Sequence, residues 1–350
     1  MGYYPCIEKR ITQIRLANRF MEDSYILVIG GAGYIGSHMV RELHRAGYKA
    51  IVLDNFSKGH RDLVVDTKIV EGDLGDANIL TNIFENYNIS SVMHFAAFSL
   101  VGESVESPLV YYRNNVSKTA SLLDSMIRYN IKNIIFSSTA AVYGEPESVP
   151  IGERHLRSPT NPYGSTKAAV EDMLLHCRKA YGLKYTSLRY FNAAGADKSG
   201  EIGERHEPES HLIPLVLKVA TGERDSIQIY GTDYPTRDGT CIRDYIHVTD
   251  LAQAHLLALK DLLNGNEGSI YNLGNSIGYS VSEVVQMARE ITGHSIPVIK
   301  TERRPGDPAI LIADSAKIRQ ELGWKPEYEN LRDIIATAWK WHQKEARLLQ

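Results

Sequence analysis

The fold is decided by the stretch Gly30-Gly31-Ala32-Gly33-Tyr34-Ile35-Gly36, which joins a short aliphatic run to a segment with helical periodicity. The run before it, Tyr25 to Ile29, is typical of a strand buried on both faces, and the helical pattern after it extends to about Ala46. Glycine permits a tight turn and close approach of the backbone to a pyrophosphate, while the helix N-terminus supplies positive potential. Such turns also serve as plain connections, but the context of strand, helix and downstream acid indicates a dinucleotide site.

The same alternation continues downstream and predicts a doubly wound parallel α/β sheet of the Rossmann type. Further strands are expected near 50–53, 68–70, 91–95, 133–137 and 185–189, with helices near 77–87, 115–129 and 163–181. After Phe191 the segments are rich in Gly, Pro and charge, which indicates functional loops and a smaller α/β domain. We therefore expect an N-terminal extension (1–23), a dinucleotide-binding domain (24–190, rejoined by 244–265) and a substrate domain (191–350).

Composition excludes several classes of partner. The chain has 350 residues, 43% of them hydrophobic and 23% charged, with a net charge of −3, which gives no reason to expect nucleic acid or an anionic membrane. The three scattered cysteines, Cys6, Cys177 and Cys241, form no disulfide framework and suit a reducing cytoplasm. No two of the twelve histidines show a convincing ligand spacing near a third ligand, so no metal site is expected.

The first 20 residues are basic and lack the apolar core of a secretory signal. An organellar presequence is one interpretation, and a disordered or helical extension upstream of the folded part is the plainer one, which we favour. Met21, just before the first strand, is a possible alternative start.

Two aspartates follow the next strands of the expected sheet. Asp54 ends the second strand, 18 residues after Gly36, where a carboxylate accepts hydrogen bonds from a ribose and repels a 2′-phosphate, so NAD is preferred over NADP. Lys58 and Arg61 follow closely and could weaken the preference for NAD. The alternative is that they are solvated loop charges. Asp73 is placed to meet the adenine, or else is an exposed turn aspartate.

A tyrosine and a lysine stand four residues apart in Tyr163-Gly164-Ser165-Thr166-Lys167, on one face of an expected helix. A free tyrosine, with a pKa of about 10, is a poor base at neutral pH. A neighbouring ammonium and a bound cationic nicotinamide would lower that pKa. The pair also occurs by chance in many helices, so it needs support from elsewhere in the chain.

That support comes from the end of the strand at 133–137, which runs into Ser137-Ser138-Thr139-Ala140-Ala141. Doubly wound sheets place ligands at this edge, so a hydroxyl here can hydrogen-bond a substrate oxygen. The alternative is that these hydroxyls cap the backbone.

At this point the sequence resembles the extended short-chain dehydrogenase/reductase family and, within it, the UDP-glucose (UDP-galactose) 4-epimerases. The resemblance runs from about Tyr25 to Trp341. It rests on the ordered motifs GGAGYIGSH, DN, GDL, HFAA, VGES, NN, SSTAAVYGE, NPYGSTK, LRYFNAAGA, HLIP, GTCIRDYIHVTD, YNLGN, RRPGDPA and LGW.

The resemblance implies that Tyr163 is the base, that Lys167 holds the nicotinamide ribose, and that Thr139 supplies a hydroxyl to the substrate, where many relatives have Ser. Ser99 stands where some relatives carry a cofactor-contacting Lys, which puts that contact in doubt. The residues expected to bind NAD are Gly30, Gly33, Tyr34, Ile35, Gly36, Asp54, Asn55, Asp73, Leu74, Phe95, Ala96, Ala97, Asn114 and Lys167.

For the UDP part of the substrate, the resemblance matches Arg243 and Arg304 to the diphosphate, which two guanidinium forks suit. Asp307 is expected at the uridine ribose and Asn192 at the sugar diphosphate, with Leu212 and Tyr230 at the uracil. His211 stands where other members often have Asn.

The implied reaction interconverts UDP-glucose and UDP-galactose. Tyr163 removes the C4 hydroxyl proton and NAD takes the C4 hydride. The 4-keto sugar then rotates to present its other face before the hydride returns. Since UDP supplies most of the binding energy, the hexose is free to turn and NAD stays bound.

Three other functions remain as alternatives. A 4,6-dehydratase needs an extra acid and base just after Thr139, where this chain has Ala140 and Ala141. A silent NAD-binding regulator would be expected to lack Tyr163 or Lys167. A plain dehydrogenase would release oxidised sugar and form NADH stoichiometrically.

Two finer expectations concern specificity and assembly. Leu311 is matched to the position bordering the sugar C2 substituent, where a bulky Tyr excludes N-acetyl sugars, so UDP-GlcNAc and UDP-GalNAc are possible substrates. Relatives are commonly homodimers that pair two helices from each subunit, here 115–129 and 163–181. The apolar side chains expected at that interface are Leu122, Leu123, Met126, Met173 and Leu174.

Overall fold

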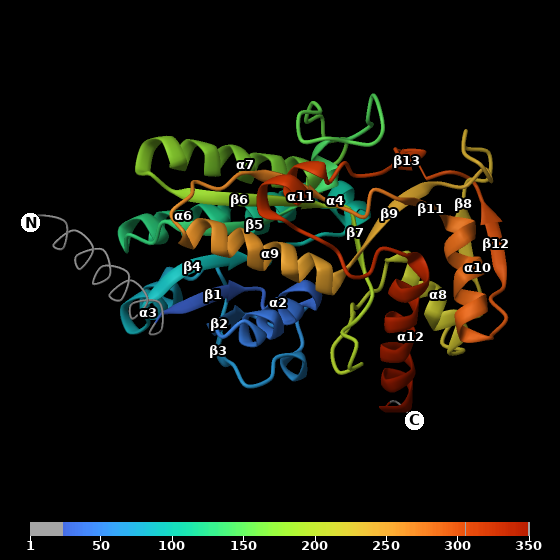
Figure 1. Ribbon diagram of the computed structural model, residues 1–350, viewed down its shortest axis with the longest axis horizontal. Helices are drawn as coiled ribbons and strands as arrows, with labels where there is room; N and C mark the ends of the chain where they lie inside the picture. The colour runs from blue at the N-terminus through green and yellow to red at the C-terminus, as the bar shows by residue number, and fades with distance from the viewer. Residues whose placement is uncertain (1–23, 305, 349–350) are drawn as a thin grey trace, which may run out of the picture.

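The computed structural model describes residues 24–304 and 306–348, and its largest element is a seven-stranded parallel sheet (Figure 1). The strand order β10-β6-β5-β4-β1-β2-β3 confirms the doubly wound sheet expected from the sequence. The strands are β1 (Tyr25–Ile29), β2 (Lys49–Asp54), β3 (Lys68–Glu71), β4 (Ile89–His94), β5 (Asn133–Thr139), β6 (Lys184–Tyr190) and β10 (Ile270–Leu273). The expected extension 1–23, with Cys6, lies outside the described residues.

Helices cover both faces of this sheet because successive side chains of each strand point to opposite sides. Ile26 and Val28 pack toward α2 (Tyr34–Arg45), α9 (Val248–Leu263) and α11 (Ala316–Leu322). Leu27 and Ile29 pack toward α3 (Ala77–Asn86), α6 (Lys118–Arg128) and α7 (Pro162–Tyr181). The sheet is therefore buried on both faces, as its near-continuous aliphatic strands predict.

The second part of the molecule lies beyond the carboxyl ends of these strands (Figure 1). It contains a mixed sheet of β7, β9, β11 and β13, a parallel pair β8–β12, and three helices around a separate apolar core. Their bounds are β7 (Asn192–Ala194), α8 (Leu212–Ala220), β8 (Ile227–Tyr230), β9 (Ile242–His247), β11 (Gly278–Ser280), α10 (Val281–Thr292), β12 (Val298–Thr301), β13 (Ile310–Leu311) and α12 (Leu331–Leu348).

The chain crosses between the two parts more than once. After β9, helix α9 packs on α2 and on the large sheet, and β10 then joins that sheet beside β6. The division of the chain into domains stays a prediction.

The region 101–117 differs from the single helix predicted near Asn115. It forms α4 (Val101–Glu106), α5 (Pro108–Tyr111) and a π-helical turn (Tyr112–Ser117) before α6 begins. The Asn115 side chain explains the irregularity, because its amide oxygen accepts from the Phe98 N–H at 2.9 Å and its NH2 donates to the Phe98 carbonyl at 2.9 Å. Such π-turns recur at functional sites.

The structure corrects the prediction of which side chains form a dimer interface. Leu122, Leu123, Met126 and Leu174 are buried in the core beneath the sheet, and Met173 packs against the same core. Leu122, Leu123, Met126 and Leu174 are therefore part of the core, whereas Met173 is only partly buried. The exposed apolar side chains of this region are instead Val101, Val105, Leu109, Val110, Tyr112, Leu175 and Tyr181.

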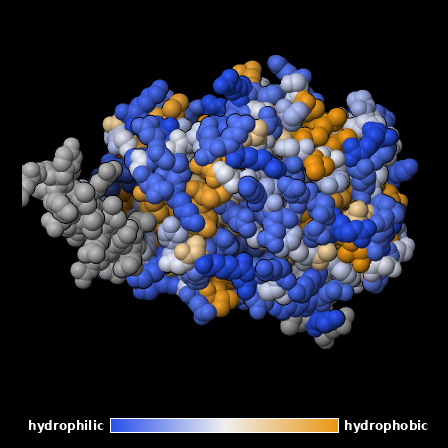
Figure 2. All heavy atoms as spheres, viewed as in Figure 1, coloured by the Kyte–Doolittle hydropathy of each residue, from blue (hydrophilic) through white to orange (hydrophobic). Residues whose placement is uncertain are grey.

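The surface seen in Figure 2 is mostly hydrophilic, with separate small apolar patches. Among the described helices, none is both long and apolar enough to pass through a membrane.

Candidate active site

A cavity of about 1000 Å³ lies between the carboxyl ends of the parallel strands and the second part of the molecule. This is the edge where doubly wound sheets bind ligands. All but two of the residues predicted for the site line it. They are Gly30, Gly33, Tyr34, Ile35, Gly36, Asp54, Asn55, Asp73, Leu74, Phe95, Ala96, Ala97, Asn114, Thr139, Tyr163, Lys167, Asn192, His211, Arg243, Arg304, Asp307 and Leu311.

The glycine turn has the geometry of a dinucleotide cradle. Gly30 has a φ of +78°, which only glycine adopts without strain. A Cβ on Gly36 would lie 2.1 Å from the Gly30 carbonyl oxygen, so the first turn of α2 packs directly on the loop. The N-terminus of α2 therefore faces the cavity with unobstructed backbone, which suits a pyrophosphate.

Asp54 closes the β2 edge of the cavity. Its carboxylate accepts backbone N–H bonds from Ala32 and Phe56, each at 2.9 Å, and is fixed next to the turn. Each carboxylate oxygen keeps a further lone pair for a ribose hydroxyl. The residues present thus fit a dinucleotide with a free 2′-hydroxyl.

Asp73 is held on the same side of the cavity. It accepts from Asn55 at 2.8 Å and from the Lys118 ammonium at 2.7 Å. Lys118 lines the cavity and was missed from the sequence, where it is one of many helix lysines. Of the two loop cations, Arg61 pairs with Glu71, while Lys58 donates to the Glu207 carbonyl at 2.7 Å.

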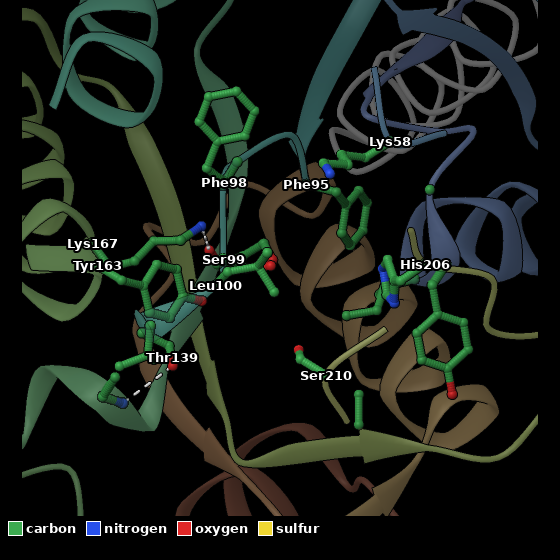
Figure 3. A pocket seen from close by; sticks show the side chains of 18 of the residues that line it. Lys58, Phe95, Phe98, Ser99, Leu100, Thr139, Tyr163, Lys167, His206 and Ser210 are labelled. Carbon is green, nitrogen blue, oxygen red and sulfur yellow. Dashed lines mark hydrogen bonds between the residues drawn. The ribbon is translucent and has the colours of Figure 1, made fainter. Parts of the chain in front are cut away.

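Tyr163 and Lys167 lie one turn apart at the start of α7, beside Thr139 at the end of β5 (Figure 3). Asn161 caps this helix by accepting from the Gly164 N–H at 2.9 Å. The Lys167 ammonium donates to the Ser137 carbonyl at 2.8 Å and lies 5.9 Å from the centre of the Tyr163 ring. The three side chains thus form one wall of the cavity, opposite His206.

The protein alone does not make Tyr163 a phenolate. Burial raises its pKa to about 12, although a hydrogen bond with Thr139 acts in the lowering direction. Burial also lowers the pKa of Lys167 to about 7, against the raising effect of Glu171. Lys167 is not among the groups that lower the Tyr163 pKa, and the lowering expected from a bound cationic nicotinamide stays a prediction.

The Thr139 hydroxyl caps the following turn by accepting from the Ala141 N–H at 3.1 Å, and a hydrogen bond with Tyr163 acts to lower the pKa of that tyrosine. The hydrogen bond of Thr139 to a substrate oxygen stays a prediction. Ala140 and Ala141, which follow it, line the cavity with methyl groups.

The opposite end of the cavity gathers the residues matched to UDP. Arg243, on β9, forms an ion pair with Asp307, and the Arg304 guanidinium stacks 3.8 Å from the centre of the Tyr230 ring. The two predicted residues that do not line the main cavity, Leu212 and Tyr230, line an adjoining pocket of about 260 Å³. His211, Asn192 and both arginines border the two spaces. The roles assigned to these residues stay predictions.

The loop between β7 and α8 supplies cavity residues that sequence reasoning did not select. Glu204, His206, Glu207, Pro208 and Ser210 all line the cavity. No motif spacing marks them, and only the folding of the loop over the sheet edge brings them to the site.

Fold and site together define an extended short-chain dehydrogenase/reductase that handles a nucleotide-linked substrate. The family described as GDP-mannose 4,6 dehydratase matches residues 27–337. The UDP-glucose 4-epimerase of Halalkalibacterium halodurans is 54% identical over 319 residues, covering 91% of this chain and 96% of that protein. The chain belongs to the UDP-glucose 4-epimerase family of NAD-dependent epimerases and dehydratases.

Solved structures agree with this assignment. The UDP-glucose 4-epimerase from Brucella ovis in complex with NAD superposes with a TM-score of 0.88 at 50% identity, covering 90% of this chain and 97% of that one. The enzyme from Bifidobacterium longum in complex with NAD+ and UDP gives a TM-score of 0.88 at 41% identity, covering 92% and 98%.

Proposed function

We propose that this chain is an NAD-dependent isomerase that interconverts UDP-glucose and UDP-galactose by inverting the sugar at C4, a step of galactose metabolism. The observation that carries the proposal is the wall formed by Tyr163, Lys167 and Thr139, in which Thr139 is followed by the methyl groups of Ala140 and Ala141. Around this wall, the glycine turn and the two arginines provide separate places for a dinucleotide and a nucleotide sugar.

NAD fits the residues present. The turn at Gly30 to Gly36 would hold its pyrophosphate, Asp54 its adenosine ribose and Lys167 its nicotinamide ribose. When bound, NAD supplies reversible hydride acceptance at the sugar C4.

The protein residues move the proton. Tyr163 takes the proton of the C4 hydroxyl and later returns it, while the Thr139 hydroxyl orients both oxygens. Because burial keeps the Tyr163 pKa near 12, the phenolate forms only when positive charge enters the cavity. Proton removal is thereby linked to an occupied cofactor site.

The nucleotide is held away from the chemistry. Arg243 and Arg304 bind the diphosphate, for which Arg243 exchanges its contact with Asp307, and Asn192 contributes beside them. Asp307 then accepts from the uridine ribose, while Leu212 and Tyr230 border the uracil. Binding through UDP leaves the hexose free to present either face to Tyr163.

A dehydratase is the second candidate, because the matching family description is that of a dehydratase. Eliminating a hydroxyl needs groups that move protons at the positions of Ala140 and Ala141, whose methyl groups cannot. Mass spectrometry of the product from UDP-glucose separates the two, since an epimer keeps the substrate mass and a dehydrated product is lighter by one water. A product that is lighter by one water would overturn the proposal.

Mass also identifies a plain dehydrogenase, whose product has lost two hydrogens. A silent regulator leaves the substrate unchanged, and because an epimer has the same mass as the substrate, chromatographic separation of UDP-galactose from UDP-glucose is needed to exclude it. Both residues whose loss would mark a silent regulator, Tyr163 and Lys167, are present and line the cavity.

We further propose a cytoplasmic homodimer. The support for a dimer is the set of exposed apolar side chains on α4 and α5, which contact α7. The support for a cytoplasmic location is that Cys177 and Cys241 are both free thiols.

A further inference from the structure

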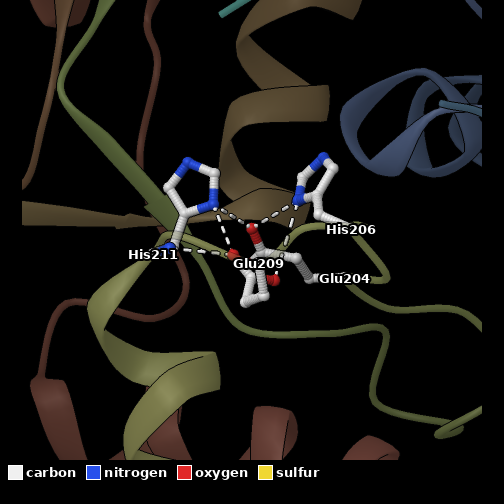
Figure 4. A group of neighbouring side chains, drawn as sticks. All are labelled: Glu204, His206, Glu209 and His211. Carbon is white, nitrogen blue, oxygen red and sulfur yellow. Dashed lines mark hydrogen bonds and ion pairs between the residues drawn. The ribbon is translucent and has the colours of Figure 1, made fainter. Parts of the chain in front are cut away.

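Four metal-ligating side chains converge in the loop that leads from β7 into α8. Glu204, His206, Glu209 and His211 point toward one another, and their ligand atoms all lie within 4.8 Å (Figure 4). The sequence predicted no metal site because no two histidines have a convincing ligand spacing near a third ligand, yet the structure brings His206 and His211 together with Glu204 and Glu209. The spacing of two, three and two residues matches no familiar metal motif, which is why the sequence did not reveal it.

The distances between the ligand atoms are those of a small coordination shell. Glu204 Oε1 lies 3.1 Å from His206 Nδ1 and 2.8 Å from His211 Nδ1. Glu209 Oε1 lies 3.0 Å from His211 Nδ1, and its Oε2 lies 3.8 Å from His206 Nδ1. Ligands about 2.0–2.1 Å from a tetrahedral zinc ion are separated by about 3.3–3.4 Å. The four distances bracket that separation, so small side-chain movements complete the shell.

The charges of the group also call for a cation. The side chains of Glu204 and Glu209 are only 5% and 4% exposed, and buried carboxylates need a positive partner. Arg205 in the loop binds Glu345 and Asp62, and Lys218 on α8 lies beside Glu207, so neither reaches the group. Within the group His211 is the positive partner: burial acts to lower its pKa, but Glu204 and Glu209 raise it well above the ordinary value. A divalent ion would take the place of the proton on His211 as the positive partner of the two carboxylates.

We propose that Glu204, His206, Glu209 and His211 bind one divalent transition-metal ion, with zinc the ion that this donor set suits. Imidazole nitrogen favours zinc over magnesium or calcium, which prefer oxygen ligands. Four protein ligands leave no open position, so the ion is structural and takes no part in the chemistry.

The position of the group indicates that a bound ion would hold the loop in place beside the substrate pocket. His206 packs edge-on against the Tyr34 ring of the glycine turn, with ring centres 6.2 Å apart. His211 directly precedes α8, whose first residue, Leu212, lines the adjoining pocket. The ion therefore fastens the loop across the cavity, between the dinucleotide turn and the nucleotide pocket.

The direct test is the metal content of untagged protein after dialysis, measured by inductively coupled plasma mass spectrometry. We expect about one zinc ion per chain and, after chelation, saturable Co²⁺ binding with the visible spectrum of a tetrahedral site. Metal far below one ion per chain together with no saturable Co²⁺ spectrum would overturn the proposal, and would show that the group is an ion-pair cluster only.

Substitution of single proposed ligands tests where the ion binds. His206→Gln and Glu209→Gln are each expected to weaken Co²⁺ binding by more than the roughly 10–100-fold that loss of an outer-shell partner costs. His294→Gln, an exposed histidine beyond α10, is the matched control and should bind as the wild type does. Equal binding by all three variants would place the metal elsewhere and contradict the proposal.

Activity provides a second readout that rests on the proposed function. Removing the ion should raise the KM for UDP-galactose more than it lowers kcat, because the loop borders the nucleotide and not the reacting carbon. Failure of the epimerase assay alone would leave the metal content and the Co²⁺ spectrum intact, so the two proposals fail separately.

Discussion

At the scale of single residues, the site depends on burial as much as on the identity of its groups. Burial raises the pKa of Tyr163 to about 12 and lowers that of Lys167 to about 7. Both groups are thus driven toward their neutral forms in the protein alone, and the tyrosine becomes a base only beside a bound cation. In the proposed mechanism, proton removal therefore depends on an occupied cofactor site.

Replacing Tyr163 with Phe should therefore lower kcat by about 10²–10⁴-fold, the usual contribution of a general base, with little change in KM. Steady-state kinetics with UDP-galactose measure both constants. Tyr181→Phe is the control, since that ring is exposed at the end of the same helix. Equal kcat values for the two variants would remove Tyr163 from the mechanism.

Leu311 is the residue expected to set the range of sugars. It lines the cavity from β13 and packs against the cluster of Val142, Tyr143 and Ile151. We predict that Leu311→Tyr lowers kcat/KM for UDP-GlcNAc relative to UDP-glucose by about tenfold or more, because the ring fills space needed by the C2 substituent. An unchanged ratio of the two kcat/KM values would show that Leu311 does not border that substituent.

At the scale of elements, a buried ion pair joins α7, which carries Tyr163 and Lys167, to β6, the neighbour of the strand that ends at Thr139. Glu171, one turn after Lys167 on α7, accepts from Arg189 Nε at 2.8 Å and from the Ser138 hydroxyl at 2.7 Å. Both charged side chains are 1–2% exposed, and Ser138 directly precedes Thr139. The pair therefore fixes α7 against β5 and β6 beneath the cavity.

Removing one partner leaves the other charge buried, so Glu171→Ala should cost about 3–5 kcal/mol of unfolding free energy. Asp172→Ala is the matched control on the next residue. Its half-exposed carboxylate pairs with Arg157 and should be worth about 0–1 kcal/mol. Urea unfolding of both variants measures the difference, and similar losses would contradict a structural role for the Glu171–Arg189 pair.

Much of this arrangement could be predicted from the sequence, because continuous aliphatic runs and helical hydrophobic patterns are local signals. The strands from Tyr25 to Arg189 and the glycine turn follow from such patterns. The π-turn at Tyr112–Ser117 does not, since it depends on the contact of Asn115 with the Phe98 backbone. The Glu204–His211 group also depends on tertiary folding of a loop.

The residues predicted for a dimer interface also show what local sequence patterns cannot predict. An amphipathic helix shows which face is apolar but not whether that face meets the core or a partner. Leu122 and Met126 turned out to lie in the core. The resemblance to a known family located Arg243, Arg304 and Asp307, which local patterns alone would have assigned to surface loops.

At the scale of the whole molecule, two sheets meet across the cavity, and exposed apolar side chains lie on one side of the large sheet. Leu109, on α5, is 67% exposed. If two copies pair through this surface, Leu109→Glu places a charge in the interface and should convert the dimer to a monomer at micromolar concentration. Light scattering after size-exclusion chromatography measures the mass. Val65→Glu is the control. Val65 is 62% exposed but lies outside α4 and α5, so this variant should have the same mass as the wild type.

Equal masses for the wild type and Leu109→Glu would contradict pairing through this surface. A monomeric wild type would contradict the dimer itself.

The most direct measurement of the central claim is to incubate the purified protein with UDP-galactose, without added NAD, and to assay for UDP-glucose. The account predicts that UDP-glucose forms and that NADH does not accumulate, because the cofactor stays bound and is regenerated in each cycle. No UDP-glucose even after NAD is added, or NADH formed in proportion to product, would contradict it.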